Sequence, residues 1–158
     1  MKKNQKGFSL IELLIVVVII GIIAAIAIPN LIASRRAANE GSAISTIRTL
    51  HSAQMTYFAA NGNGQYGVLS DLRNIVAIDQ IVATGSKSGY KFTSSPDNGS
   101  TPRTFVIDAV PTIPTTTISQ TGSRRFCITI EGVIRADANN IGTQITTPTD
   151  CVYGIAIQ

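Results

Sequence analysis

The sequence predicts an α+β protein in which one long helix packs against an antiparallel sheet of four or five strands. Apolar and small residues recur at helical spacing from about Phe8 to Ala60. After residue 90, apolar and polar residues alternate in short runs separated by turn residues, as is typical of strands. With 158 residues, the chain has room for one globular domain beside the first part of the helix.

The first part of the helix is a predicted membrane span. All twenty-one residues from Phe8 to Ile28 are apolar or small except Glu12. A helix of this length covers roughly 31 Å, which is about the thickness of a bilayer's hydrocarbon core. An acidic side chain inside such a span costs on the order of 3 kcal/mol, and the nearest Lys and Arg residues lie outside it. Cleavage between Gly7 and Phe8 would create an α-amino group close to Glu12.

Beyond Pro29, which should kink the helix, the pattern becomes amphipathic. Charged residues interrupt the apolar content, so this part should leave the membrane and pack against the sheet. Asn61 to Gly64 should end the helix. His51 is the only histidine, and we expect it to be solvated or hydrogen-bonded rather than catalytic or metal-binding. The expected apolar stripe consists of Ile44, Ile47, Leu50, Gln54 or Met55, and Phe58.

The remaining elements follow from shorter patterns. A short helix capped by Ser70 should carry Leu69, Leu72, Ile75 and Val76, and a Thr-rich loop should run from Thr112 to Thr121. The segment SSPDNGSTP should form a turn region, and Glu131-Gly132 a two-residue hairpin turn. One face of the sheet should be apolar. The expected strands are Tyr90–Thr93, Thr104–Val110 with Phe105, Ile107 and Ala109 on one face, the two arms of RRFCITI-EG-VIRAD with Phe126, Ile128 and Ile130 on one face, and Cys151–Ile157 with Tyr153, Ile155 and Ile157 on one side.

The segment KGFSLIE followed by a long apolar run resembles the N-terminus of type IV pilins. The resemblance implies cleavage after Gly7 by a prepilin peptidase, N-methylation of Phe8, and pairing of Glu12 with the amine of a neighbouring subunit. Gly21 and Pro29 match the places where filaments of the family lose helical structure. The expected organisation is a leader at 1–7 that is removed, an apolar transmembrane and assembly helix at 8–29, and a globular head at 30–158.

The resemblance also implies the partners and the location. The expected partners are copies of the chain in a helical filament, the prepilin peptidase and methyltransferase, the inner-membrane assembly machinery, and membrane lipid before assembly. The leader lysines should keep the N-terminus cytoplasmic until the subunit moves to a surface filament that serves adhesion, motility or DNA uptake. A pseudopilin of a type II secretion system is the alternative. A membrane-tethered binding or enzymatic domain that never assembles is the alternative from another class.

Two further readings of the N-terminus stay open. Ala25-Ile26-Ala27 could end an ordinary secretory signal, and the segment could be a generic single-pass anchor. The first reading leaves Glu12 unexplained in the apolar region, and the second does not explain the spacing of Gly7, Phe8 and Glu12.

Cys127 and Cys151 should form a disulfide in an exported chain, in agreement with the resemblance, although two buried free thiols are the alternative. Without the leader, ten basic and nine acidic residues remain, and this balance argues against a nucleic-acid surface. The common catalytic and cofactor motifs are absent, so we expect neither an enzyme nor a cofactor. Asn98-Gly99-Ser100 should be a surface turn, the Thr-rich loop could carry O-linked sugar, and the aromatic residues should pack rather than conduct charge.

Overall fold

The computed structural model describes residues 7–60, 62–75, 78–114, 119–139, 141–151 and 154–157. The chain divides into two compact units, one ending at Ser34 and the other beginning at Arg35. Helix α1 (Leu10–Ala60) contributes to both units. It starts two residues later than expected and continues through Pro29. The expected kink at Pro29 stays a prediction.

In the first unit, none of the described residues from Gly7 to Ser34 is buried. This part of α1 is long and apolar enough to cross a membrane, judged by length and composition. The second unit is organised around one sheet.

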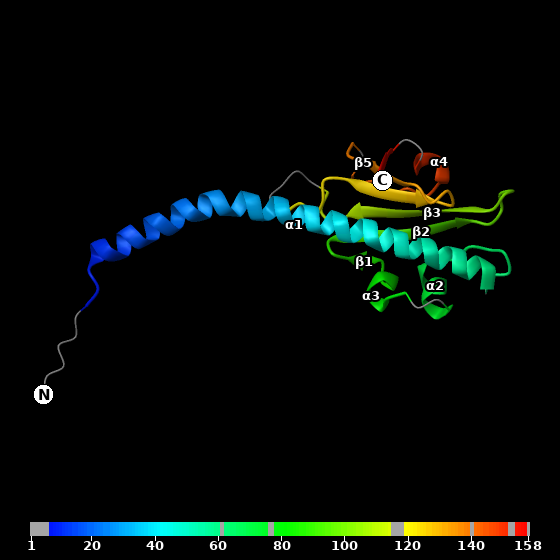
Figure 1. The fold of residues 1–158 in the computed structure, drawn as a ribbon, viewed down its shortest axis with the longest axis horizontal. Coiled ribbons are helices and arrows are strands. Elements are labelled where there is room, and N and C mark those ends of the chain that lie inside the picture. The colour runs from blue at the N-terminus through cyan, green and yellow to red at the C-terminus, as the bar shows by residue number, and fades with distance from the viewer. Residues whose placement is uncertain are drawn as a thin grey trace, which may run out of the picture. The chain divides into compact units, whose positions relative to one another are not determined.

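The sheet of the second unit is antiparallel throughout, as predicted, and its six strands pair in sequence order. Figure 1 shows the strands beside the second half of α1. The strand that the sequence did not predict is β1, which is two residues long and too short for a detectable alternation. The strands are β1 (Ser86–Lys87), β2 (Tyr90–Asp97), β3 (Thr104–Pro111), β4 (Arg125–Thr129), β5 (Ile134–Asp137) and β6 (Ile155–Ile157).

One face of the sheet packs on α1 and holds the main core. Ile47 and Leu50 of the helix are fully buried in the same cluster as three phenylalanines of the sheet. The expected stripe is confirmed for these two residues, and Gln54 is also fully buried. The expected face of β3 is confirmed, because Phe105, Ile107 and Ala109 lie in this cluster. The expected face of β4 is confirmed for Phe126 and Ile128 but wrong for Ile130, which follows the end of β4 and is exposed.

The opposite face is buried too, so the expectation of a single apolar face is wrong. Val106 and Cys127 lie in a second, smaller cluster with Ile145 and Cys151. The segment after β5 supplies the last two residues and covers this face, which alternation within the strands alone could not reveal.

Three predicted boundaries are wrong. Strand β2 continues through Asp97, because its residues pair with β3 as far as Asp97 opposite Thr104. The β4–β5 connection is Ile130–Val133 rather than a two-residue turn, with Gly132 at φ 75° and its N–H donating to the carbonyl of Thr129.

The predicted strand from Cys151 to Ile157 is shorter than expected. Cys151 instead ends a helical turn, α4 (Pro148–Cys151), and β6 holds only the last three predicted residues. The N–H of Asp150 donates to the carbonyl of Thr147, which closes that turn. Tyr153 lies outside the described residues.

The connector after α1 contains two short helices rather than one. In α2 (Leu69–Ile75), the carboxylate of Asp71 accepts from the N–H of Val68, so Asp71 and not Ser70 caps the helix. The unpredicted α3 (Gln80–Ala83) is capped by Asp79. Asn61, predicted to help end α1, and Val76, predicted to lie in the short helix, are outside the described residues.

Gln54 ties this connector to α1. Its buried side-chain oxygen accepts from the N–H of Gly67, and its nitrogen donates to the carbonyl of Gly67 and to Ser94 Oγ. The Gln54 amide therefore bonds to both the N–H and the carbonyl of Gly67, as the backbone of a neighbouring strand would. These bonds give both polar atoms of a side chain buried in the core a hydrogen-bond partner.

Candidate functional site

The N-terminal end of α1 is held by Glu12. The backbone N–H of Ser9 donates to Glu12 Oε2 at 2.9 Å, and the N–H of Leu13 donates to the carbonyl of Ser9 at 3.2 Å. Ser9 and Glu12 stand at the spacing of a capping box, in which the acidic side chain satisfies an N–H that the helix leaves without a partner. The S-x-x-E pattern of Ser9 and Glu12 is the sequence signal for this cap.

The contact with Ser9 gives the Glu12 carboxylate a partner inside its own subunit. The carboxylate also lies in the first turn, where the helix dipole favours negative charge. A single subunit can therefore accommodate Glu12 without a cation. Pairing with a neighbour's amine would be an additional interaction.

The rest of the first unit presents apolar side chains on every side of the helix. Phe8 is 83% exposed and Leu10 80%. A methyl group added at Gly21 would meet no atom within 4 Å apart from its own helix and chain neighbours. A surface of this kind is stable only when lipid or other apolar helices cover it. The exposed large residues between Ile11 and Leu31 are Ile11, Leu13, Leu14, Ile15, Val16, Val17, Val18, Ile19, Ile20, Ile22, Ile23, Ile26, Ile28 and Leu31.

The first turns of α1 in the second unit hold a polar cluster around Glu40, which is 6% exposed. Glu40 Oε1 accepts from the N–H and the Oγ of Ser123, and Oε2 accepts from Arg124 Nη2 at 2.7 Å. Asn39 Nδ2 donates to the carbonyl of Thr121 at 2.9 Å. The end of the β3–β4 loop is thus fastened to the helix, whereas the Thr-rich loop was expected as a surface loop; residues 115–118 of that loop lie outside the described part.

Burial alone would raise the pKa of Glu40, but the hydrogen bonds from Ser123 and Arg124 outweigh it and lower the pKa below its ordinary value. Glu40 is therefore ionised at neutral pH and acts as an anchor for the loop.

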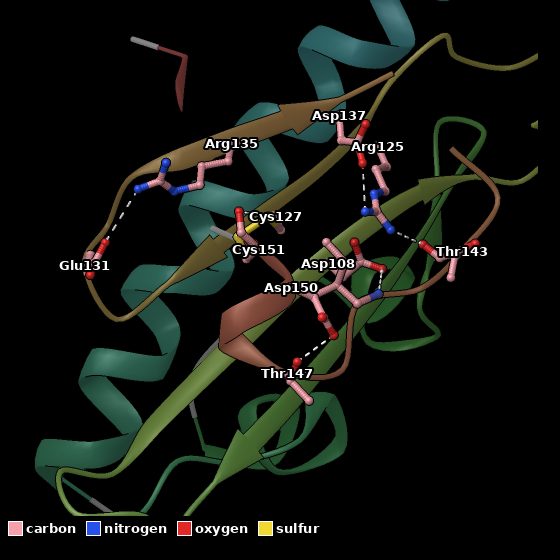
Figure 2. Close-up of a disulfide and its surroundings, with 11 residues drawn as sticks. Asp108, Arg125, Cys127, Glu131, Arg135, Asp137, Thr143, Thr147, Asp150 and Cys151 are labelled. Carbon is pink, nitrogen blue, oxygen red and sulfur yellow. Dashed lines mark hydrogen bonds and ion pairs between the residues drawn. A yellow bond between two sulfur atoms is a disulfide. The ribbon is translucent and has the colours of Figure 1, made fainter. Parts of the chain in front are cut away.

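Cys127 and Cys151 form the predicted disulfide, with a Cα–Cα distance of 5.8 Å. The bond joins β4 to α4 beneath the segment that covers the second face (Figure 2). Beside it, Arg125 of β4 pairs with Asp137 of β5 at 2.8 Å. Its Nη1 also donates to the carbonyl of Thr143 at 2.9 Å.

Comparison with known proteins agrees with the N-terminal geometry. Residues 2–28 match the family described as the prokaryotic N-terminal methylation motif. The chain is 36% identical over 126 residues to the type IV narrow pilus major component PilA5 of Thermus thermophilus, and this match covers 77% of the chain and 93% of the relative. The chain belongs to the type IV pilin family.

Other relatives of this pilin match over shorter stretches. The type IV major pilin protein PilA of Myxococcus xanthus is 36% identical over 58% of this chain and 39% of its own length. The type II secretion system core protein G of Aeromonas hydrophila is 39% identical over 35% of this chain and 39% of its own length. The pilin thus spans about two fifths of each of these two relatives. No solved structure matches it.

Three functional or polar residues of this pilin escaped the sequence analysis, although each left a signal. Glu40 falls on the apolar stripe of α1, four residues before Ile44. Asp108 and Arg125 interrupt the apolar content of β3 and β4, where a charge implies a buried partner.

His51 differs from expectation. Its ring lies 5.6 Å from that of Phe105, and its Nε2 is buried with no hydrogen-bond partner among the described residues. It is therefore a packing residue of the helix. The described chain also contains no group of three metal-ligating side chains.

The Asn98 side chain is not a free surface group either. Its oxygen accepts from the N–H of Tyr66 and its nitrogen donates to the carbonyl of Tyr66. The Tyr66 ring in turn stacks on Phe58 at 4.7 Å, in agreement with a packing role for these aromatic residues.

Proposed function

We propose that this pilin is a structural, non-enzymatic subunit that polymerises through its N-terminal helix into an extracellular type IV pilus. The observation that carries the proposal is the first unit: an apolar helix with no buried residue, which begins at a matched methylation motif. Pilus components among the relatives support the same role.

In this proposal, a prepilin peptidase removes residues 1–7 after Gly7, and the new N-terminus at Phe8 is methylated. Residues 8–29 hold the subunit in the inner membrane with the N-terminus cytoplasmic, while the head, 30–158, lies outside. The assembly machinery then moves the subunit from lipid to a filament. There the same helix contacts copies of itself, with flexibility at Gly21 and Pro29. Intact-mass measurement tests the processing, because the mature chain should begin with N-methylated Phe8.

Glu12 has two roles to separate, a helix cap within one subunit and a charge that pairs between subunits. Glu12→Ala removes both, whereas Glu12→Gln removes the charge but keeps an oxygen that can accept from Ser9. With either variant as the only copy, we expect normal membrane insertion and processing but few or no filaments by electron microscopy. A buried charge pair penalises wrong registers between apolar helices, and neither variant retains it.

The exposed Glu131 provides the matched control, because Glu131→Gln removes a carboxylate of the head and should leave filament numbers unchanged. Filaments from Glu12→Gln but not from Glu12→Ala would assign Glu12 to capping alone. Wild-type filament numbers from both variants would contradict the charge-pairing role.

A second candidate is a pseudopilin, because several relatives are core proteins of type II secretion systems. Deletion of the gene separates the two. Loss of surface filaments supports the pilus, and loss of protein secretion with filaments intact supports the pseudopilin.

A further inference from the structure

The second face of the sheet buries a carboxylate at its centre. Asp108 of β3 lies directly opposite Thr93 of β2 and Cys127 of β4, so the three side chains form a row across this face. Asp108 is fully buried. Figure 2 shows it between the disulfide and the ion pair of Arg125 with Asp137.

Residues Gly142–Thr147, which we call the flap, cover Asp108. At the end of the flap, the carbonyl of Thr147 accepts from the N–H of Asp150, and Thr147 Oγ1 donates to the Asp150 carboxylate. The N–H of Ile145 donates to Asp108 Oδ2 at 3.0 Å, and the carbonyl of Thr143 accepts from Arg125. The Ile145 side chain is 3% exposed, while every other residue of the flap is exposed. The disulfide at Cys151 fastens the chain just after the flap.

The second carboxylate oxygen of Asp108 has no hydrogen bond with the described residues to offset the cost of its burial. Oδ1 is buried without a hydrogen-bond partner in the described part of the chain, and the same holds for Thr93 Oγ1 across the strand. A protonated carboxyl group carries no charge in this buried site, whereas an ionised one must keep a full charge out of water, with an Oδ1 that accepts from no donor among the described residues.

The charged residues around Asp108 do not remove this cost. Lys91 on β2 is exposed at the rim, and Asp150 in α4 is exposed as well. Arg135 on β5 is opposite Cys127 and bonds to Glu131. Arg125 is the nearby cation, and it already pairs with Asp137.

Burial therefore dominates and raises the pKa of Asp108 to about 7, although the N–H of Ile145, the charge of Arg125 and the N–H of Ala109 each act to lower it. With the flap open, water reaches the carboxyl group and its pKa returns toward the ordinary value of 3.8.

We propose that the flap is a proton-dependent cover, closed over the sheet while Asp108 carries its proton and released when that proton leaves. The disulfide holds Cys151 in place, so the flap opens as a tethered segment and the strands stay paired. Its opening uncovers Asp108, the Ile145 side chain and the sulfur atoms.

The direction of the pH dependence follows from the two pKa values. Because the closed state has the higher value, closure is most stable below about pH 4 and weakens as the pH rises towards 7. Between about pH 5.5 and about pH 8.5 the opening equilibrium should increase roughly 30-fold.

Hydrogen exchange of the full-length protein in detergent micelles tests the flap directly. After correction for the intrinsic exchange rate, the protection of the peptide containing Ile145 should fall tenfold or more from pH 5.5 to 8.5. Peptides of β3 and β4 should not change. In Asp108→Asn, which keeps an oxygen for the Ile145 N–H but cannot ionise, protection should be the same at both pH values.

The rate at which a phosphine reduces the disulfide gives a second measurement on the same samples. Divided by the rate at which the same phosphine reduces a small-molecule disulfide at the same pH, it should rise with pH in the wild type but not in Asp108→Asn. Glu131→Gln is the matched control, because it removes an exposed carboxylate of the same unit that pairs with Arg135 rather than with the flap, and it should keep the wild-type pH dependence. Equal protection of the wild-type flap at both pH values would overturn the proposal. An unchanged pH dependence in Asp108→Asn would overturn it as well.

Discussion

The two faces of the sheet are built from the same strands but are stabilised in different ways. The face toward α1 is covered by a helix and filled with rings and branched side chains such as Leu50, Phe105 and Phe126. The core cluster on the other face has four residues, Val106, Cys127, Ile145 and Cys151, and its cover is fastened by a disulfide and by hydrogen bonds to Asp108 and Arg125. Large apolar area stabilises one face, whereas a short segment with little apolar area depends on a covalent bond.

The largest effect should come from shortening a residue on the helix-covered face. Leu50→Ala should lower the free energy of unfolding by about 3.5 kcal/mol, because it leaves a cavity in the main core. Val106→Ala is the matched change on the other face and should cost about 2 kcal/mol. Urea unfolding of both variants measures the difference, and equal costs would show that the faces contribute alike.

Removal of the disulfide should affect the second face specifically. Cys127→Ser with Cys151→Ser should destabilise the second unit by about 3 kcal/mol, the value expected for a loop of this length. Proteolysis should cut the segment between β5 and β6 first and leave the α1-facing core protected. If the variant instead became susceptible along α1, the disulfide would be supporting both faces.

The polar cluster on α1 should contribute less than the helix-covered core. Glu40→Gln should cost about 2 kcal/mol, because it leaves Arg124 without its anion and weakens the bonds from Ser123. Arg124→Gln should cost well under half as much, since the Arg124 side chain is 43% exposed. Thermal unfolding compares the two variants, and equal losses would mean that the ion pair rather than the buried carboxylate carries the effect.

The sequence predicted the features that depend on long periodic patterns. The long helix, the apolar faces of β3 and β4, and the antiparallel sheet all follow from spacing alone. Glu40, Asp108 and Arg125 were missed because their partners, such as Ser123 and the Ile145 N–H, lie far away in the chain. The cover of the second face was missed for a related reason, because the flap has no periodicity of its own.

The methylation motif was predictable from the sequence, since Gly7, Phe8 and Glu12 stand at a recognisable spacing, while the roles of these residues in processing and assembly stay predictions. The hydrogen bond from Ser9 to Glu12 was within reach of the same pattern and shows that local capping and intersubunit pairing must be tested separately.

The strand order carries a consequence for how the head forms. Each strand from β2 to β6 pairs with the strand that precedes it in the chain, so each of them finds a partner that has already been synthesised. Such neighbour-to-neighbour pairing keeps contacts local and favours rapid folding. The main exception is α1. It is synthesised first, but Ile47 and Leu50 become buried only after the sheet has formed. Until the last strands emerge, the apolar stripe of the helix stays uncovered and open to wrong partners, which places the greatest risk of aggregation early in the life of the chain.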